Sequence, residues 1–167
     1  LNEFDDLELG NFVQQGLANV SLPGRVEVIS RDPWLIVDSA HTKASALALA
    51  RALEDFPPGP RHFVISISSD KDPDAILSAL LPGAGHVTLT RAEPRRSIDL
   101  QKLSKLVSRQ WKGEVKICED PAKAIEQARK SLRGSALLCA AGSVYLAGIA
   151  RTVLKDPPER LAPNGRT

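Results

Sequence analysis

The sequence has no phosphate-binding loop of the form G-x-x-x-x-G-K-[ST], so the chain alone carries no ATP site of the Walker type. No G-x-G-x-x-G follows its first predicted strand, which argues against a dinucleotide dehydrogenase. The H-E-x-x-H and G-x-S-x-G motifs are also missing. Because the three histidines are scattered over different elements, a metal site built by this chain is not expected.

Other shortages narrow the class of protein. No apolar run approaches the roughly 20 residues that a membrane helix requires, and the acidic start LNEFDDLELG lacks the order of a signal peptide. The formal net charge is only +2, which gives no support for binding to nucleic acid or to a membrane. The two cysteines, Cys118 and Cys139, match no metal spacing and are predicted to be buried, reduced thiols of a cytoplasmic protein.

What the sequence does contain is an alternation of apolar runs and helical repeats, over a length that suits one domain. Strands are predicted at 26–29, 34–37, 63–67, 87–89, 115–118 and 136–140. Several runs are apolar throughout, as in strands buried on both faces of a parallel sheet. The connection Arg31-Asp32-Pro33 is too short for a helix, so the first two strands are expected to pair antiparallel. The predicted fold class is α/β: a doubly wound, mostly parallel six-stranded sheet with one antiparallel strand at its N-terminal end.

Helices are expected between the strands, where apolar residues recur at helical spacing. Asp72 and Asp120 each precede a proline and are predicted N-caps, and Ser97 is predicted to cap the helix that follows it. Residues 1–20 hold one helical candidate outside the alternation, and residues 155–167 form a tail, rich in proline and charge, that is expected to be disordered. The α/β domain is therefore predicted at residues 21–154.

Loops that follow predicted strands lie at the sheet edge where open α/β folds bind ligands. Asp38 ends an apolar run, so its carboxylate suits the diol of a ribose, and His41 follows at the helix entrance. Asp38 and Thr42 could equally serve only as helix caps. Ser143 follows the last strand at a helix N-terminus, which favours an anion such as a carboxylate, and a plain serine cap is the alternative. Lys71, after the third strand, is interpreted as a solvated loop residue.

A joint of proline and glycine, Pro23-Gly24, precedes the first strand, as an interdomain connection requires. Arg25 follows it and could reach a phosphate group from there, although a lone arginine after a turn is usually solvated. The hypothesis is that Arg25 at this hinge and Asp38 at the sheet rim face one nucleotide pocket.

In this order the motifs resemble those of the Mur ligase superfamily, and within it the branch of folylpolyglutamate synthase and dihydrofolate synthase. The resemblance covers roughly residues 10–154. Its four parts are LPGRVEV at 22–28, the family's hinge; DSAHT at 38–42, a strand-end loop; SDKD at 69–72; and AGSVYLAG at 141–148. The last two resemble the folate branch. Ser39 stands where a glycine is common, and Thr42-Lys43 replaces a common Asn-Pro.

The resemblance implies the C-terminal domain of an ATP-dependent ligase that adds L-glutamate to folate, by polyglutamylating tetrahydrofolate, converting dihydropteroate to dihydrofolate, or both. ATP would phosphorylate a carboxylate, and the amine of glutamate would attack the acyl phosphate. The phosphate loop and the Mg²⁺ ligands would belong to a central ATPase domain of the same chain, of which residues 1–20 would be a remnant. The fragment alone is expected to be inactive, and the enzyme to be a monomer.

Residue by residue, the resemblance implies that Arg25 contacts the ATP phosphates and Asp38 the ribose. His41 would line the nucleotide or glutamate side of the cleft, and Ser143 would hold the incoming glutamate. Two alternatives stay open: a cell-wall ligase acting on a UDP-muramyl peptide, and a non-catalytic α/β binding module. The motifs of the folate branch argue against the first, and the helix and hinge at residues 9–25 argue against the second.

Overall fold

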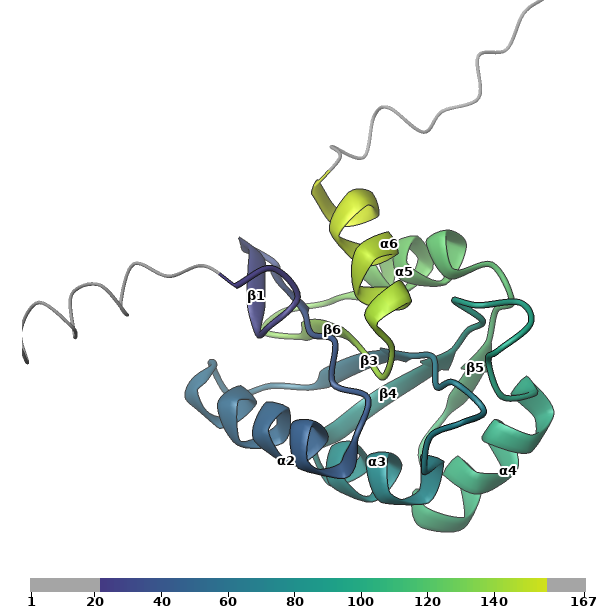
Figure 1. Ribbon diagram of the computed structural model, residues 1–167. Helices are drawn as coiled ribbons and strands as arrows, with labels where there is room; N and C mark the ends of the chain where they lie inside the picture. Colours follow the sequence, from purple (N-terminus) through teal and green to yellow (C-terminus); the bar gives the residue numbers. More distant parts are fainter. Residues whose placement is uncertain (1–21, 156–167) are drawn as a thin grey trace, which may run out of the picture.

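The structure, a computed structural model, describes residues 22–155 as a sheet covered by helices on both faces (Figure 1). The strands are β1 (Glu27–Arg31), β2 (Trp34–Val37), β3 (Arg61–Ile65), β4 (Ala84–Leu89), β5 (Val115–Ile117) and β6 (Leu137–Ala141). The helices are α2 (Lys43–Ala52), α3 (Pro73–Leu80), α4 (Leu100–Gln110), α5 (Pro121–Ser131) and α6 (Val144–Lys155), with 3₁₀ turns at Leu53–Asp55 and Leu81–Gly83.

The six strands lie in the order β1-β2-β6-β3-β4-β5. β1 pairs antiparallel with β2, and every other pair of neighbours is parallel. The predicted α/β class, with one antiparallel strand at the N-terminal end, is therefore confirmed. β2 has the predicted bounds. The first strand begins one residue later than predicted, because Val26 has a φ of 43° and lies outside the extended region.

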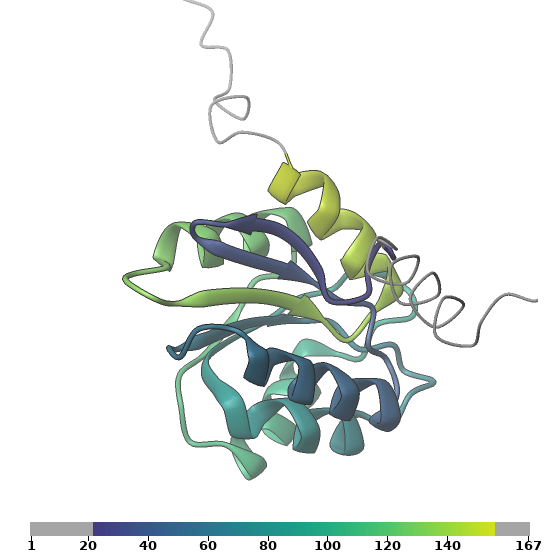
Figure 2. The same cartoon turned by 90° about the vertical axis from the view of Figure 1, so that its left-hand side faces the viewer.

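The sheet separates two layers of helices (Figure 2), and an apolar core lies on each of its faces. Helices α2, α3 and α4 pack on one face, where Ile36 of β2 and Ile65 of β3 are buried. Helices α5 and α6 pack on the other face, where Val37 and Val64 are buried. Because successive residues of a strand point to opposite faces, both faces are apolar, which explains the unbroken apolar runs.

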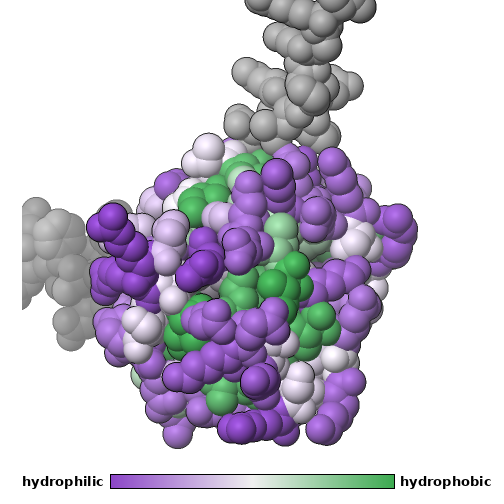
Figure 3. Space-filling view, turned by 90° about the vertical axis from the view of Figure 1, so that its right-hand side faces the viewer, coloured by the Kyte–Doolittle hydropathy of each residue, from purple (hydrophilic) through white to green (hydrophobic). Residues whose placement is uncertain are grey.

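The edge strand β5 lies on the side of the molecule that also carries α4, where apolar surface is ringed by hydrophilic side chains (Figure 3). Ile117 of β5 is 40% exposed. The strand has only three residues, and the exposed Lys116 lies in its middle. A short edge strand that carries a lysine is one way in which proteins oppose edge-to-edge pairing.

Two of the three predicted helix caps are confirmed. Asp72 accepts a hydrogen bond from the N–H of Ala75 at the start of α3, and Asp120 caps α5. The prediction for Ser97 is wrong, because Asp99 directly precedes α4 and accepts from its first free N–H groups. The Ser97 hydroxyl instead accepts from the N–H of Glu93.

The cysteine prediction holds for one of the two residues. Cys139 is buried in β6, and this burial raises the pKa of its thiol far above the usual range. Cys118 is only half-buried, with its sulfur 3.4 Å from the carbonyl oxygen of Asp120.

Among residues 22–155, no helix combines the length and apolarity needed to cross a membrane. Lys155, expected in the tail, still belongs to α6, and the predictions for residues 1–20 and 156–167 lie outside the described residues.

Candidate functional site

Four loops that follow the carboxyl ends of β2, β3, β4 and β6 surround one cavity of about 170 Å³. β6 lies between β2 and β3 in the sheet. Helix α2, which connects β2 to β3, covers one face, and α5, which connects β5 to β6, covers the other. The edge at the carboxyl ends of these strands is therefore the topological switch point of the fold. The lining residues are His41, Ser68, Lys71, Glu93, Arg96, Ser143, Val144 and Tyr145. The structure thus brings two of the four predicted site residues, His41 and Ser143, into one cavity.

The loop between β6 and α6 places Ser143 at the cavity. Gly142 has a φ of +99°, and a Cβ atom there would lie 2.5 Å from the carbonyl oxygen of Ser66, so the sharp turn requires glycine. The Ser143 hydroxyl oxygen accepts hydrogen bonds from the N–H of Tyr145, at 3.1 Å, and of Leu146, at 3.5 Å. Ser143 therefore has the geometry of the serine cap and lies at the helix end that favours an anion.

His41 is held at the cavity by its own loop. Its Nδ1 lies 2.7 Å from the carbonyl oxygen of Ser39, which can only accept, so Nδ1 carries the proton and donates. In the neutral ring, Nε2 is then the acceptor. Thr42 caps α2 through a capping box with Ser45, as the cap interpretation of Thr42 predicts.

The loop after β3 contributes a cation, Lys71, which the sequence predicted to be a solvated loop residue. The side chain of Lys71 is 34% exposed, lines the cavity and pairs with Asp70 at 3.1 Å. Arg96 of the loop after β4 also pairs with Asp70, at 3.7 Å. The hydrogen bond from Lys71 and the positive charges of Lys71 and Arg96 lower the pKa of Asp70 despite some loss of hydration.

Glu93 is the buried anion of the cavity. It accepts a hydrogen bond of 2.8 Å from the Ser68 hydroxyl and pairs with Arg96 at 3.6 Å. An isolated β-bridge between Ser68 and Ser97 joins the loops after β3 and β4. Sequence reasoning missed both Glu93 and Arg96; the available signal was the charged run that directly follows β4. Two cations beside a helix N-terminus give this cavity a surface suited to carboxylates.

Asp38 lies beside this cavity but holds the backbone. It is 5% exposed, and its two oxygens accept hydrogen bonds from the N–H of Val26, at 2.7 Å, and of Ala40, at 2.6 Å. It does not cap α2, since Thr42 does. The contact with Val26 fixes a β-branched residue at positive φ, a conformation that costs on the order of 1–3 kcal/mol. Asp38 therefore ties the hinge to the sheet rim.

Arg25 is exposed and lines a different cavity, of about 360 Å³, which is formed by the hinge, β1 and the end of α6. Glu27 and Lys155 line the same cavity. Glu27 accepts from the N–H of Gly24 at 2.8 Å and pairs with Arg151 and Lys155 of α6, at 2.6 and 3.1 Å. Burial alone would raise the pKa of Glu27, but these contacts outweigh it and the pKa is lowered. The hinge is thus bound to α6 on one side and, through Asp38, to β2 on the other.

Comparison with known proteins places this geometry in a family. The family described as "Mur ligase, glutamate ligase domain" matches residues 24–144. A curated relative, the dihydrofolate synthase/folylpolyglutamate synthase of Mycobacterium tuberculosis, is 31% identical over 165 residues, which are 90% of this chain and 34% of the relative. The chain therefore spans about a third of the length of that relative.

Solved structures agree with the sequence comparison. A folylpolyglutamate synthase from Mycobacterium tuberculosis, in complex with ADP, superposes with a TM-score of 0.79 at 32% identity, over 90% of this chain and 36% of that one. A folylpolyglutamate synthase from Thermotoga maritima superposes with a TM-score of 0.71 at 29% identity, over 92% of this chain and 34% of that one. The predicted resemblance is therefore confirmed.

Proposed function

This chain belongs to the Mur ligase, glutamate ligase domain family, and we propose that it is the C-terminal domain of an ATP-dependent ligase that adds L-glutamate to folate. The domain would close over ATP and position the incoming amino acid while the acceptor carboxylate is activated as an acyl phosphate. Catalysis of this kind depends mainly on positioning and on charge stabilisation.

The observation that carries the proposal is the cavity at the carboxyl ends of the strands. We place the two carboxylates of L-glutamate among Lys71, Arg96 and the N-terminus of α6 at Ser143, all of which offer N–H or O–H donors. Glu93, held by Ser68 and Arg96, would attract the amino group. His41, with Nε2 as acceptor, could take a proton from that amine as it attacks.

On the nucleotide side, we propose that Arg25 contacts the ATP phosphates and that Asp38 receives the ribose. Arg25 is exposed at a joint of proline and glycine, from which its side chain can swing. Asp38 already accepts two N–H groups, but each carboxylate oxygen has a second lone pair for a hydroxyl. Meeting a common nucleotide would require segment 24–26 to move, because Arg25 lines a cavity that does not include the buried Asp38.

ATP and Mg²⁺ would be bound mainly by a central domain of the same longer protein. Residues 22–155 contain no group of three or more His, Cys, Asp or Glu side chains that could hold a metal ion, so we assign no Mg²⁺ ligand to them. The folate or dihydropteroate acceptor, the monomeric state and the cytoplasmic location stay predictions.

The test is an assay of the longer protein that contains this domain, for ATP-dependent addition of L-glutamate to tetrahydrofolate and to dihydropteroate. A parallel assay uses a UDP-muramyl peptide as acceptor. We expect product with a folate acceptor only, and a rise in the KM for glutamate in Ser143→Ala, because that variant removes a hydroxyl at the helix end.

Ser108→Ala, an exposed serine on α4, is the matched control and should leave the KM unchanged. Product with the muramyl peptide would assign the domain to the cell-wall branch. No ATP-dependent product with any acceptor would instead favour a binding module and overturn the proposal.

A further inference from the structure

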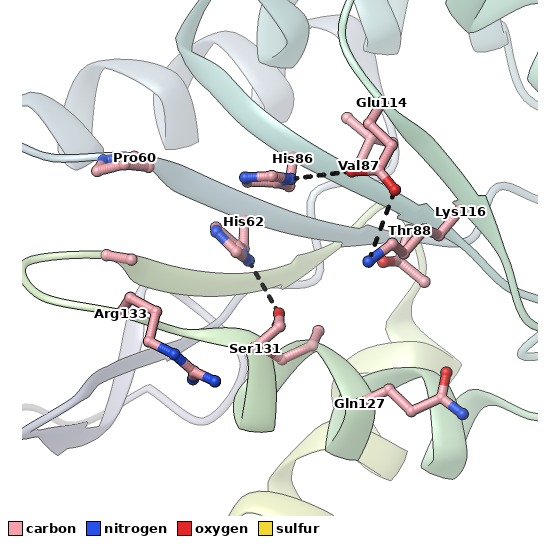
Figure 4. Close-up of a pocket in the computed structure, with 12 residues that line it drawn as sticks. Pro60, His62, His86, Val87, Thr88, Glu114, Lys116, Gln127, Ser131 and Arg133 are labelled. Atoms are coloured by element: carbon pink, nitrogen blue, oxygen red, sulfur yellow. Dashed lines mark hydrogen bonds and ion pairs between the residues drawn. The ribbon is translucent and has the colours of Figure 1, made fainter.

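A second cavity, of about 460 Å³, lies at the opposite end of the sheet from the candidate site (Figure 4). His62 and His86, near the amino ends of β3 and β4, form its centre, and their rings are 4.2 Å apart. Lys116 of β5 and Arg133, just after α5, line it as well. Because the candidate site lies at the carboxyl ends of the same strands, the two cavities share no residue.

The cavity exists because α5 and α6 cover only part of their face of the sheet. The strand residues buried under α5 and α6 belong to β2, β3 and β6, whereas β4 and β5 lie at the far side of the sheet and contribute His86 and Lys116 to the cavity. On this uncovered strip the side chains of His86 and Lys116 are solvent-accessible, as expected of an open sheet face. His62 is different, because only 8% of it is exposed. Contact with water therefore does not account for a polar ring at this position.

The hydrogen bonds of His62 fix its tautomer. The Ser131 hydroxyl donates to the carbonyl oxygen of Ala128, at 2.8 Å, so its oxygen is free to accept from Nδ1 of His62, at 3.4 Å. The proton of the neutral ring therefore resides on Nδ1, and Nε2 carries a lone pair. Protonation at Nε2 would turn this atom into a donor.

The charges that face the two rings are mainly positive. They are Lys116 and Arg133, together with one carboxylate, Glu114, which lies 3.7 Å from Lys116 and 3.9 Å from His86. Arg133 donates to the carbonyl oxygens of Lys130 and Leu132 and so neutralises the carbonyl end of α5. With both histidines neutral, these three groups sum to one positive charge, and each protonated ring adds another.

We propose that this cavity binds a small oxyanion, a phosphate or carboxylate group, between His62, His86 and Lys116. The anion accepts hydrogen bonds from Nε2 of the protonated rings and from the ammonium group, with Arg133 at the rim. A negative charge there also removes the repulsion that two protonated rings in contact would otherwise suffer.

Proton uptake accompanies binding. Burial, the neighbouring His86 and the charge of Lys116 lower the pKa of His62, so its ring is neutral at pH 7.5 in the free protein. The anion favours the charged ring and raises that pKa, so the affinity for an anion whose own charge stays constant must increase as the pH falls. Acetate keeps its charge over this range, and we expect its binding to tighten about three- to tenfold between pH 7.5 and pH 6.0.

The test is an NMR titration of the 167-residue chain with inorganic phosphate and, separately, with acetate, following the imidazole C–H signals. The chain has three histidines, so His62→Gln and His86→Gln variants complete the assignment and His41 reports on the candidate site. We expect the signals of His62 and His86 to shift and saturate along one binding curve, and the signal of His41 to follow a separate curve if the candidate site also takes up the anion. The probe that binds more tightly, phosphate or acetate, identifies the anionic group that the ligand carries.

Lys116→Gln changes a side chain that is 62% exposed, so the fold is expected to persist, and it should weaken binding about three- to tenfold. Lys123→Gln, at the other end of α5, is the matched control and should not weaken it. The proposal is overturned if neither probe shifts His62 and His86 at about 20 mM, if only His41 responds, or if Lys116→Gln binds as the unmodified chain does.

Discussion

The hinge and the strand-end cavity use their polar groups in opposite ways. At the hinge, the carboxylates of Asp38 and Glu27 are 5% and 10% exposed and are engaged by backbone N–H groups and cations of the same domain. In the cavity, Lys71 and Arg96 pair with neighbouring carboxylates and still reach solvent. The difference separates carboxylates whose hydrogen bonds and ion pairs hold the backbone from cations that stay accessible at the cavity. Substitutions should therefore separate the two regions by stability and by kinetics.

The largest loss of stability is expected from Gly142→Ala, at the turn that builds the cavity. The added Cβ would meet the Ser66 carbonyl oxygen at 2.5 Å, at a φ of +99°. We expect a loss of about 3–5 kcal/mol in the free energy of unfolding, measured by urea denaturation. Gly148→Ala, within α6 and with nothing near its added Cβ, should instead stabilise the domain by up to about 1 kcal/mol. Equal stability of the two variants would contradict the described turn.

Next comes Asp38→Ala, which tests the hinge. The substitution leaves the N–H groups of Val26 and Ala40 without their acceptor, so we expect a loss of about 2–4 kcal/mol. Asp55→Ala, an exposed aspartate after α2, should stay within about 0.5 kcal/mol of the unmodified domain in the same urea experiment. If the two losses matched, Asp38 would not be holding the hinge.

A smaller, pH-dependent loss is expected from Glu27→Gln. The folded state lowers the pKa of Glu27 below 4.5, so the charged carboxylate stabilises the fold above that pH and this contribution disappears as the pH falls through the lowered pKa. We expect the variant to cost about 1–2 kcal/mol at pH 7 and progressively less below about pH 4.5. Urea unfolding at pH 7, 5, 4 and 3 measures this, and a cost that grows on acidification would refute the pairing with α6.

The smallest change in stability is expected from Lys71→Gln, within about 0.5 kcal/mol, because its side chain is partly exposed and pairs with one exposed carboxylate. Lys102→Gln on α4 is the control in the same denaturation experiment, with an equally small effect. A loss above about 2 kcal/mol would mean that Lys71 is part of the scaffold rather than of the cavity.

Much of the fold could be predicted because its signals are local. The apolar run Trp34–Val37 and the short Arg31-Asp32-Pro33 connection suffice for a buried strand and its antiparallel partner. The predicted third strand, 63–67, lies two residues beyond the observed one, 61–65, because Arg61 and His62 are polar and yet pair with β4. Cap prediction failed where a better acceptor, Asp99, lay closer to the helix than Ser97.

The site was predicted only in part, because its contacts are not local. His41 and Ser143 could be found from their places after strands, and both line the cavity. Glu93 and Arg96 reach it through the bridge between Ser68 and Ser97, which no spacing in the sequence indicates. The idea that Arg25 and Asp38 face one pocket stays a prediction that requires the hinge to move.

The most direct test of the central claim is the KM for L-glutamate of Lys71→Gln in the longer protein that we propose to be a ligase, measured at saturating ATP and folate. Loss of a charged donor to a carboxylate should raise this KM about tenfold or more, with the KM for ATP within about twofold of the unmodified enzyme. An unchanged KM for glutamate, or a rise confined to ATP, would show that the incoming amino acid binds elsewhere.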